Sequence, residues 1–257
     1  MNLKISIITV CFNSEKTIRD TIESVIAQDY TDIEYIIVDG GSNDSTMSII
    51  QEYEDSINTV ITEIDKGIYD AMNKGIKLAT GDVIGILNSD DIFENSLVIS
   101  DVIKLFKSIP SVSLIFGDVV IVDPIKTENI IRFCSSKNFR RWKLRFGWMP
   151  PHPATFIKKT VYEQVGNYSL DYKISADYEL FVRMLMVNQL NYSRMNKILV
   201  RQRAGGVSTS GFKSSLLLNS EIVEACKING FYTNLFLVLL KIPFKLLELV
   251  KKPKGVS

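Results

Sequence analysis

Short unbroken runs of apolar, β-branched residues alternate with helical patterns through the first half of this chain. Four such runs cover residues 5–10, 35–38, 59–64 and 83–87. A run without polar alternation predicts a strand that is buried on both faces, as in a parallel sheet. Helices are expected between the runs, over residues 13–28, 45–53 and 69–78. The βαβα order therefore predicts an α/β fold with a mostly parallel central sheet and helices on both faces.

A helix at residues 96–106 and a strand at 113–122 complete the regular part of the pattern. Beyond residue 123 the pattern becomes less regular, with strands expected at 128–133, 154–158 and 197–200. Helices are expected at residues 160–165 and 176–187. Because no internal repeat or low-complexity linker divides the chain, we predict one domain over residues 1–210 and a helical tail over 211–257.

Composition argues against some classes of function. The formal net charge of +1 disfavours bulk attraction to nucleic acid. Three cysteines, Cys11, Cys134 and Cys226, are too far apart for a zinc site or a disulfide framework. The apolar run near Met1 is too short for a signal peptide. We therefore expect a cytoplasmic protein.

Two adjacent carboxylates, Asp90 and Asp91, follow the predicted strand 83–87 after Asn88 and Ser89. Acids at the carboxyl end of a strand lie where open α/β sheets bind ligands. Crowded carboxylates repel each other unless a cation lies between them, and hard oxygen ligands suit Mg²⁺ or Mn²⁺ beside a phosphate. The alternative is an ordinary polar turn, because Asn, Ser and Asp are common turn residues.

Asp39 ends the strand predicted at 35–38 and precedes Gly40 and Gly41, which allow a ligand to approach the backbone closely. A carboxylate there can accept hydrogen bonds from a base or from ribose hydroxyls. The glycine signature of dinucleotide-binding folds is absent after the first strand, which disfavours a dehydrogenase. A polar turn with a helix cap at Ser45 is the alternative.

Several segments, in this order, resemble the inverting glycosyltransferases of family 2, which have the GT-A-type fold. The matching segments are residues 7–13, 38–46, 65–75, 87–91, 151–156 and 175–180. Motifs that occur together in the right order are far more specific than any single one. The resemblance covers residues 3–210 and implies a nucleotide-sugar-binding half over residues 1–123 and an acceptor half over 124–210.

The resemblance implies nucleotide-binding roles for residues of three motifs. Thr9 and Asp39 would contact the nucleoside base and ribose. Asp65 and Lys66 would lie near the nucleotide as well. Lys74 could add positive charge, but a lysine on a helix is more often simply solvated.

The same resemblance assigns the acidic pair to the sugar and the metal. Asp90 would lie beside the ribose or sugar, and Asp91 would coordinate a Mn²⁺ or Mg²⁺ that bridges the diphosphate. Such an ion neutralises charge on the departing nucleoside diphosphate. The motif departs from a literal Asp-X-Asp, because Asn88 and Ser89 precede two adjacent acids.

Asp177 is our candidate for the catalytic base. It opens the predicted helix 176–187, whose apolar residues would anchor it while its first turn faces a cleft. A helix N-terminus favours the anion, and the base would take the proton of an acceptor hydroxyl that attacks the anomeric carbon. Glu179 is the second candidate. Alternatively, Asp177 only satisfies first-turn N–H groups.

His152, the only histidine, lies between two prolines and could bind a metal or a phosphate, or line an acceptor pocket. A lone histidine is more often structural. Arg201 and Arg203 precede Gly205 and Gly206 in a predicted loop. That loop could close over the diphosphate, because arginine binds phosphate with two parallel hydrogen bonds. A mobile surface loop is the alternative.

Two segments have the composition of a membrane contact. The first, Phe139 to Trp148, holds both tryptophans among lysines and arginines, which is typical of membrane interfaces. The second, Phe231 to Lys252, contains an apolar stretch that Lys241 interrupts before it could span a bilayer. We therefore expect peripheral membrane attachment, with a core or oligomer helix as the alternative.

Together the motifs and the resemblance predict a metal-dependent glycosyltransferase, and the resemblance implies inversion. The enzyme would move a sugar from a nucleoside diphosphate sugar to a hydroxyl of a glycan or polyprenol-linked acceptor. The resemblance also implies a role in surface polysaccharide synthesis, and we expect the protein in the cytoplasm at the inner face of the plasma membrane. One alternative is a sugar-phosphate nucleotidyltransferase, which the absence of a glycine-rich phosphate loop disfavours. The other is a non-catalytic nucleotide-sugar-binding assembly subunit, which the intact acids disfavour.

Overall fold

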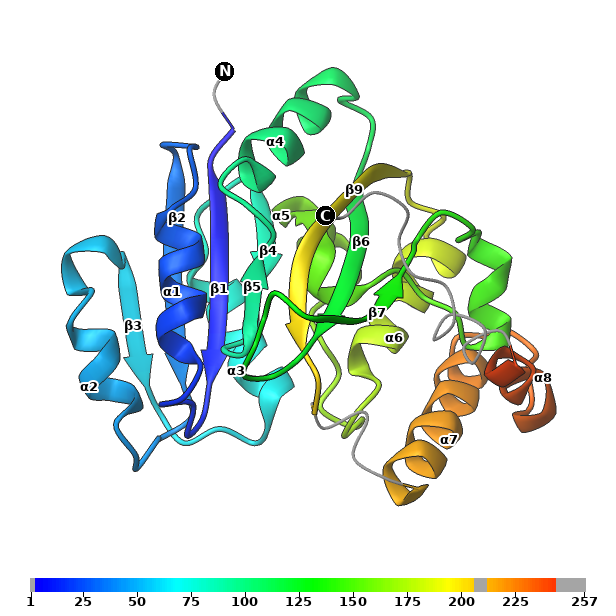
Figure 1. The fold of residues 1–257 in the computed structure, drawn as a ribbon. Helices are drawn as coiled ribbons and strands as arrows, with labels where there is room; N and C mark the ends of the chain where they lie inside the picture. The colour runs from blue at the N-terminus through cyan, green and yellow to red at the C-terminus, as the bar shows by residue number, and fades with distance from the viewer. Residues whose placement is uncertain (1–2, 206–211, 244–257) are drawn as a thin grey trace.

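The computed structural model describes residues 3–205 and 212–243. Its strands are β1 (Ile5–Cys11), β2 (Ile33–Asp39), β3 (Thr59–Thr62), β4 (Val83–Ile86), β5 (Asp91–Phe93), β6 (Leu114–Val122), β7 (Ile130–Cys134), β8 (Thr155–Lys158) and β9 (Tyr192–Arg203). They form one sheet in the order β3-β2-β1-β4-β8-β6-β9-β5, with β7 paired to β6 (Figure 1). Strands β1 to β4 are parallel, whereas β8 runs antiparallel to β4 and β6. The predicted fold class is confirmed.

Helices cover both faces of this sheet. They are α1 (Ile18–Ile26), α2 (Thr46–Gln51), α3 (Ile68–Leu78), α4 (Val98–Ser108), α5 (Lys159–Val165), α6 (Ala176–Val182), α7 (Phe212–Ile228) and α8 (Leu235–Leu239). Short 3₁₀ turns lie at η1 (Glu54–Ser56), η2 (Arg141–Phe146) and η3 (His152–Ala154), and α6 continues as a π-turn, η4 (Arg183–Val187). Buried residues of α1, α2 and α4 pack on one face, and those of α3, α5, α6 and α7 pack on the other.

Strand β1 shows why its sequence is apolar without interruption. Ile5 and Ile7 pack in the cluster that contains α1 and α4, whereas Ile8 and Val10 pack with α3 on the opposite face. Successive side chains of a strand point to opposite faces, so both sets must be apolar when both faces are covered. Helix α3 approaches β1 so closely that a Cβ on Gly75 would lie 2.4 Å from Ile8 Cγ2.

The ends of several elements differ from those predicted. The first helix begins at Ile18 rather than at residue 13, because residues 12–17 form a loop. Ser45 precedes α2, but its side chain makes no capping hydrogen bond. The last strand extends over twelve residues because β9 pairs with both β6 and β5. Strand β5 was not predicted, since its three residues follow a polar motif that reads as a turn.

The chain after β9 returns to the same core. Ile222, Ala225 and Cys226 of α7 and Val238 of α8 are buried in the cluster that contains α6. Figure 1 shows α7 and α8 packed together beside α6. Within residues 3–205 and 212–243, no helix is long and apolar enough to cross a bilayer. Residues 244–252 of the predicted membrane segment, and Gly206 of the predicted loop, lie outside the described residues.

Candidate active site

A cleft of about 880 Å³ lies at the carboxyl ends of β1 and β4. Strand β1 has β2 on one side and β4 on the other, so the chain order changes direction there, and open α/β sheets bind ligands at such a point. The cleft is lined by residues 10–17 after β1, residues 88–90 after β4, the start of α3, and residues beside and within the first turn of α6. Segments from both halves of the chain therefore share one cavity.

The loop after β1 forms one wall and is hydrogen-bonded to two other loops. The Asn13 amide donates to Ser42 Oγ at 2.8 Å, and Asn13 Oδ1 accepts from the Asn43 amide at 3.0 Å. Asn13 has a φ of 49°, a left-handed conformation that asparagine tolerates. The hydroxyls of Ser14 and Ser89 lie 2.8 Å apart, which joins this wall to the acidic loop. Residues predicted to start a helix thus fix the shape of the cleft.

Asp65 and Asp90, which the sequence singles out as candidate donor-binding residues, both line the cleft. Asp65 Oδ1 accepts from the Gly67 amide at 2.8 Å, and a Cβ on Gly40 would lie only 2.4 Å from Asp65 Oδ2. Glycine at position 40 therefore leaves room for this carboxylate. Burial raises the pKa of the Asp90 carboxyl, and Arg203 partly opposes that shift.

Asp91, predicted to be the metal ligand, is placed differently. It is fully buried, and it is Asp90 that lines the cleft. Asp91 is the first residue of β5, and adjacent residues in extended chain point to opposite sides. Burial, together with the neighbouring Asp90, raises the pKa of Asp91 well above its usual value. The geometry favours Asp90 as the residue that could reach a metal ion.

Oxygen atoms around Asp90 fit a divalent cation in part. Asn88 lines the cleft, and its Oδ1 is buried without a hydrogen-bond partner, as is Asp91 Oδ1. Among the described residues, no three His, Cys, Asp or Glu side chains gather to hold an ion by themselves. Mg²⁺ is commonly held by one or two carboxylates together with substrate phosphates. Asp90 and Asn88 Oδ1 are therefore the groups of this chain that could contribute to such a site.

Asp177 lines the same cleft. Its Oδ1 accepts from the Tyr178 amide at 2.8 Å and from the Tyr69 hydroxyl at 3.3 Å. Burial raises the pKa of Asp177, and His152 and the hydrogen bonds only partly oppose this shift. The expected effect of the helix N-terminus is thus outweighed by desolvation. Glu179, the second candidate, is buried in an ion pair with Arg183 and does not line the cleft.

His152 lies in the cleft beside Asp177. Its Nε2 is hydrogen-bonded to the Tyr168 hydroxyl at 2.7 Å, and its ring also packs against Phe181. Burial lowers the pKa of His152, which favours the neutral imidazole, although Asp177 partly opposes this. The histidine therefore lies with Asp177 and Tyr168 rather than with the acidic loop after β4.

Thr9 and Asp39 are fully buried and do not line the cleft, contrary to the expected contacts with base and ribose. Thr9 Oγ1 accepts a hydrogen bond from Tyr35. The Asp39 carboxylate accepts hydrogen bonds from the amides of Gly41 and Ser42 at 3.1 and 3.0 Å. These bonds form the polar turn that was the alternative interpretation of Asp39. In this structure Asp39 organises the loop after β2, and Thr9 links the side chains of β1 and β2.

Arg201 and Arg203 also point away from the cleft. Arg201 forms an ion pair with Glu94 at 2.8 Å. Arg203 is paired with Asp20, and its Nη1 donates to the carbonyl oxygen of Asp90 at 2.9 Å. Gln202, between the two arginines on β9, is the residue that lines the cleft. Successive side chains of a strand point to opposite sides, so Gln202 faces the cleft while Arg201 and Arg203 face away from it. The sequence analysis missed this because it expected a loop at these residues, which lie in β9.

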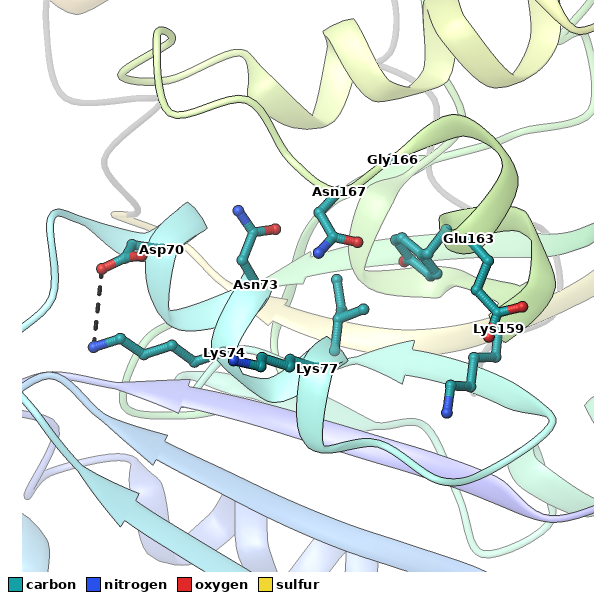
Figure 2. Close-up of a pocket in the computed structure, with 10 residues that line it drawn as sticks. Asp70, Asn73, Lys74, Lys77, Lys159, Glu163, Gly166 and Asn167 are labelled. Atoms are coloured by element: carbon teal, nitrogen blue, oxygen red, sulfur yellow. Dashed lines mark ion pairs between the residues drawn. The ribbon is translucent and has the colours of Figure 1, made fainter.

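Lys66 and Lys74 do not line the cleft. Lys66 is exposed. Lys74 lines a second hollow of about 560 Å³ between α3 and α5, where it lies 3.9 Å from Asp70 (Figure 2). Lys74 is also paired with Glu63 at 3.3 Å, so its charge is balanced locally. Lys173, which does line the cleft, carried no recognisable signal in the sequence.

Comparisons with known proteins agree with this geometry. The sequence model of glycosyl transferase family 2 matches residues 6–166. An uncharacterized glycosyltransferase of Mycobacterium tuberculosis is 33% identical over 186 residues, which cover 71% of this chain and 69% of that relative.

Solved structures share the fold at low sequence identity. TarS 1–349 of S. aureus in complex with UDP-GlcNAc has a TM-score of 0.65 at 18% identity, covering 86% of this chain and 67% of that one. The mannosyltransferase PcManGT of Pyrobaculum calidifontis, in complex with GDP-Man and Mn²⁺, has a TM-score of 0.65 at 16% identity, covering 97% and 74%. These similarities establish the GT-A fold.

Proposed function

The chain belongs to glycosyl transferase family 2 and is a glycosyltransferase, and we propose that it is a metal-dependent enzyme that transfers a sugar from a nucleoside diphosphate sugar to a hydroxyl group with inversion. The observation that carries this proposal is that Asp90 and Asp177 line the same cleft. Residues 1–123 bind the donor in this proposal, and residues 124–210 bind the acceptor. Asp65 is the donor-half carboxylate that faces the nucleotide.

Asp177 is the base in the proposed reaction. Its carboxylate takes the proton of the acceptor hydroxyl while that oxygen attacks the anomeric carbon from the face opposite the diphosphate. The Tyr178 amide and the Tyr69 hydroxyl orient the carboxylate. A raised pKa makes Asp177 a stronger base than an exposed aspartate at the pH where both are ionised.

Asp90 and Asn88 Oδ1 would hold the divalent cation on the donor side. When bound, the ion would neutralise negative charge on the diphosphate leaving group. The chain fixes the acidic loop through the Ser14–Ser89 hydrogen bond and through Arg203, which donates to the Asp90 carbonyl. These contacts hold the carboxylate in place before a donor arrives.

Thermal unfolding with a panel of nucleotides tests the donor assignment. We expect one of UDP, GDP or dTDP to raise the melting temperature with Mn²⁺ and to lose this effect with EDTA, whereas CMP, which has a single phosphate, should give no Mn²⁺-dependent rise. A ligand at 100 times its dissociation constant adds about 2.7 kcal/mol, or about 5–10 °C for a chain of this size. A folded protein that responds to none of these nucleotides, with or without their sugars, would contradict the proposal.

The acceptor that we propose is a glycan or polyprenol-linked oligosaccharide at a membrane surface. Trp142 is 58% exposed and Phe236 is 71% exposed. Their segments lie side by side, because Arg145 Nε donates to the Tyr232 carbonyl at 2.9 Å and Lys241 Nζ lies 3.4 Å from the Gly147 carbonyl. Exposed aromatic residues beside cations suit a membrane interface.

Vesicle binding tests this surface. Phe236→Glu should lower partitioning into anionic vesicles by about 10-fold or more, because an exposed Phe gains about 1.5–3 kcal/mol on burial. Ile125→Glu is the matched control, since Ile125 is 89% exposed in another part of the protein, the segment between β6 and β7. Equal partitioning of the wild type and the Phe236 variant would refute the membrane contact.

A further inference from the structure

We propose that Glu221 of α7 is a positioning residue for Asp177. It acts through the backbone of residues 173–175, which leads directly into α6. This inference rests on the proposed role of Asp177 as the base. It places a functional residue beyond residues 6–166, the part of the chain that the family's sequence model matches.

The Glu221 carboxylate accepts three backbone hydrogen bonds from one short segment. Its Oε1 accepts from the Lys173 amide at 2.9 Å, and its Oε2 accepts from the amides of Ile174 and Ser175 at 3.0 and 2.9 Å. Glu221 is only 6% exposed, so these amides have little access to water as an alternative partner. Hydrogen bonds to a carboxylate are stronger than neutral ones and hold their donors in a fixed arrangement.

The segment held by Glu221 touches the cleft at several points. Lys173 and Ile174 line the cleft, and Ser175 precedes the first turn of α6, where Asp177 lies. The Tyr69 hydroxyl donates to the Ile174 carbonyl at 2.6 Å, and its oxygen also lies 3.3 Å from Asp177 Oδ1, so the one O–H is shared between these two acceptors. A shift of Ile174 would therefore move both the base and the hydroxyl that orients it.

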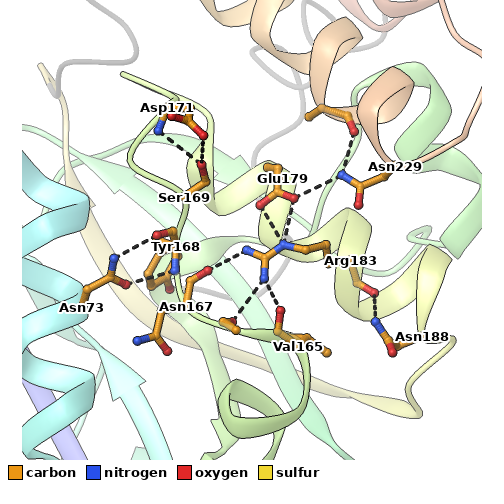
Figure 3. Close-up of polar contacts among 12 residues, drawn as sticks. Asn73, Val165, Asn167, Tyr168, Ser169, Asp171, Glu179, Arg183, Asn188 and Asn229 are labelled. Atoms are coloured by element: carbon orange, nitrogen blue, oxygen red, sulfur yellow. Dashed lines mark hydrogen bonds and ion pairs between the residues drawn. The ribbon is translucent and has the colours of Figure 1, made fainter.

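Other side chains hold the earlier part of the same connection between α5 and α6. Figure 3 shows Arg183 hydrogen-bonded to the carbonyl oxygens of Val165 and Asn167 and paired with Glu179. It also shows Asn73 bonded to both backbone groups of Tyr168, at 2.9 and 3.0 Å. These anchors lie before residue 173. Glu221 of α7 holds residues 173–175, the part of this connection that is nearest to the base in sequence.

Glu221→Gln removes the negative charge with little change in shape, and places an amide N–H₂ where an acceptor is needed. Glu224→Gln is the matched control, because it is the same substitution at an exposed position of the same helix. We expect faster hydrogen exchange of the amides at 173–175 in the Glu221 variant alone. Unchanged exchange in a folded Glu221 variant would overturn the proposal.

Turnover gives the second readout. It is measured as the release of nucleoside diphosphate when water replaces the acceptor and hydrolyses the nucleoside diphosphate sugar. A displacement of about 1 Å at a reacting group can cost about 100-fold in rate. We expect kcat to fall by about 10- to 100-fold in Glu221→Gln, with the donor dissociation constant within about twofold of the wild type. An equal loss in Glu224→Gln, or a loss confined to donor binding, would overturn the proposal.

A double-mutant cycle separates this inference from the proposed function. If Glu221 acts through Asp177, adding Glu221→Gln to Asp177→Asn should cause no further loss, whereas independent effects would multiply. A full additional loss would refute the positioning role. Asp177→Asn with wild-type turnover would instead refute the base assignment, and the inference with it. Should Glu221→Gln not fold, Glu221→Asp replaces it, and a wild-type kcat in that variant overturns the inference alone.

Discussion

Replacing Asp177 by Asn is expected to lower the rate of sugar transfer by about 100- to 10,000-fold, the usual contribution of a general base. Asparagine has the same shape and can still accept the hydrogen bonds from the Tyr178 amide and the Tyr69 hydroxyl. It cannot accept the proton of the acceptor hydroxyl. Donor binding should be unchanged, because the proposal assigns the donor to Asp90 and Asp65 rather than to Asp177. Nucleotide titration of the variant measures this.

The pH dependence of the wild type provides a second signature of this base. Burial raises the pKa of Asp177, so the inactive protonated form should persist to higher pH than for an exposed aspartate. We expect the rate to fall as pH decreases through this raised pKa, and the step to vanish in Asp177→Asn. Asp171→Asn is the control, because Asp171 is exposed in the segment that precedes α6. A rate in Asp177→Asn equal to that of this control would disprove the assignment.

Replacing Asp90 by Asn is expected to abolish the metal-dependent part of donor binding and to lower kcat/KM by at least about 100-fold. The reason is that Asp90 is the acid of the pair that lines the cleft, whereas asparagine is a much weaker ligand for a hard cation. The Mn²⁺-dependent rise in melting temperature measures this directly. It should disappear in the variant, although nucleotide alone still binds.

Asp91→Asn distinguishes the two acids. Asp91 is fully buried and its pKa is raised well above the usual value, so replacing it should remove little charge from the cleft. We expect Asp91→Asn to keep its Mn²⁺ response while losing some thermal stability. If the Mn²⁺ response is instead lost in Asp91→Asn and kept in Asp90→Asn, the metal ligand is Asp91, as the sequence motif alone suggested.

The architecture could be read from the sequence because the signals are local and periodic. Unbroken apolar runs identify strands covered on both faces, and the intervening helices impose a parallel order on β1 to β4. Strand β5 was missed for the opposite reason: three residues after a polar motif carry no periodicity. The length of β9 also escaped prediction, because its pairing with β6 and β5 involves distant parts of the chain.

The candidate site could be predicted only down to its segments. In the sequence, Asp39, Asp65 and Asp90 end or follow predicted strands. All three lie at or beyond the carboxyl ends of β2, β3 and β4 in the structure. It did not reveal that Asp39 is hydrogen-bonded within its own turn. The side on which a residue of a short strand points depends on the register with its neighbours. A run of only three residues does not specify that register.

The sequence by itself determined the fold class, the sheet edge where the chemistry lies, and the residue types gathered there, because each follows from local patterns and from the chirality of βαβ units. The tertiary structure decided which acid faces the cleft, that Gln202 rather than its neighbouring arginines lines it, and that Asp177 and Asp90 line the same cleft. It also decided that Glu221 holds the backbone before the base. These outcomes depend on contacts between residues far apart in the chain, and single-sequence patterns do not encode such contacts.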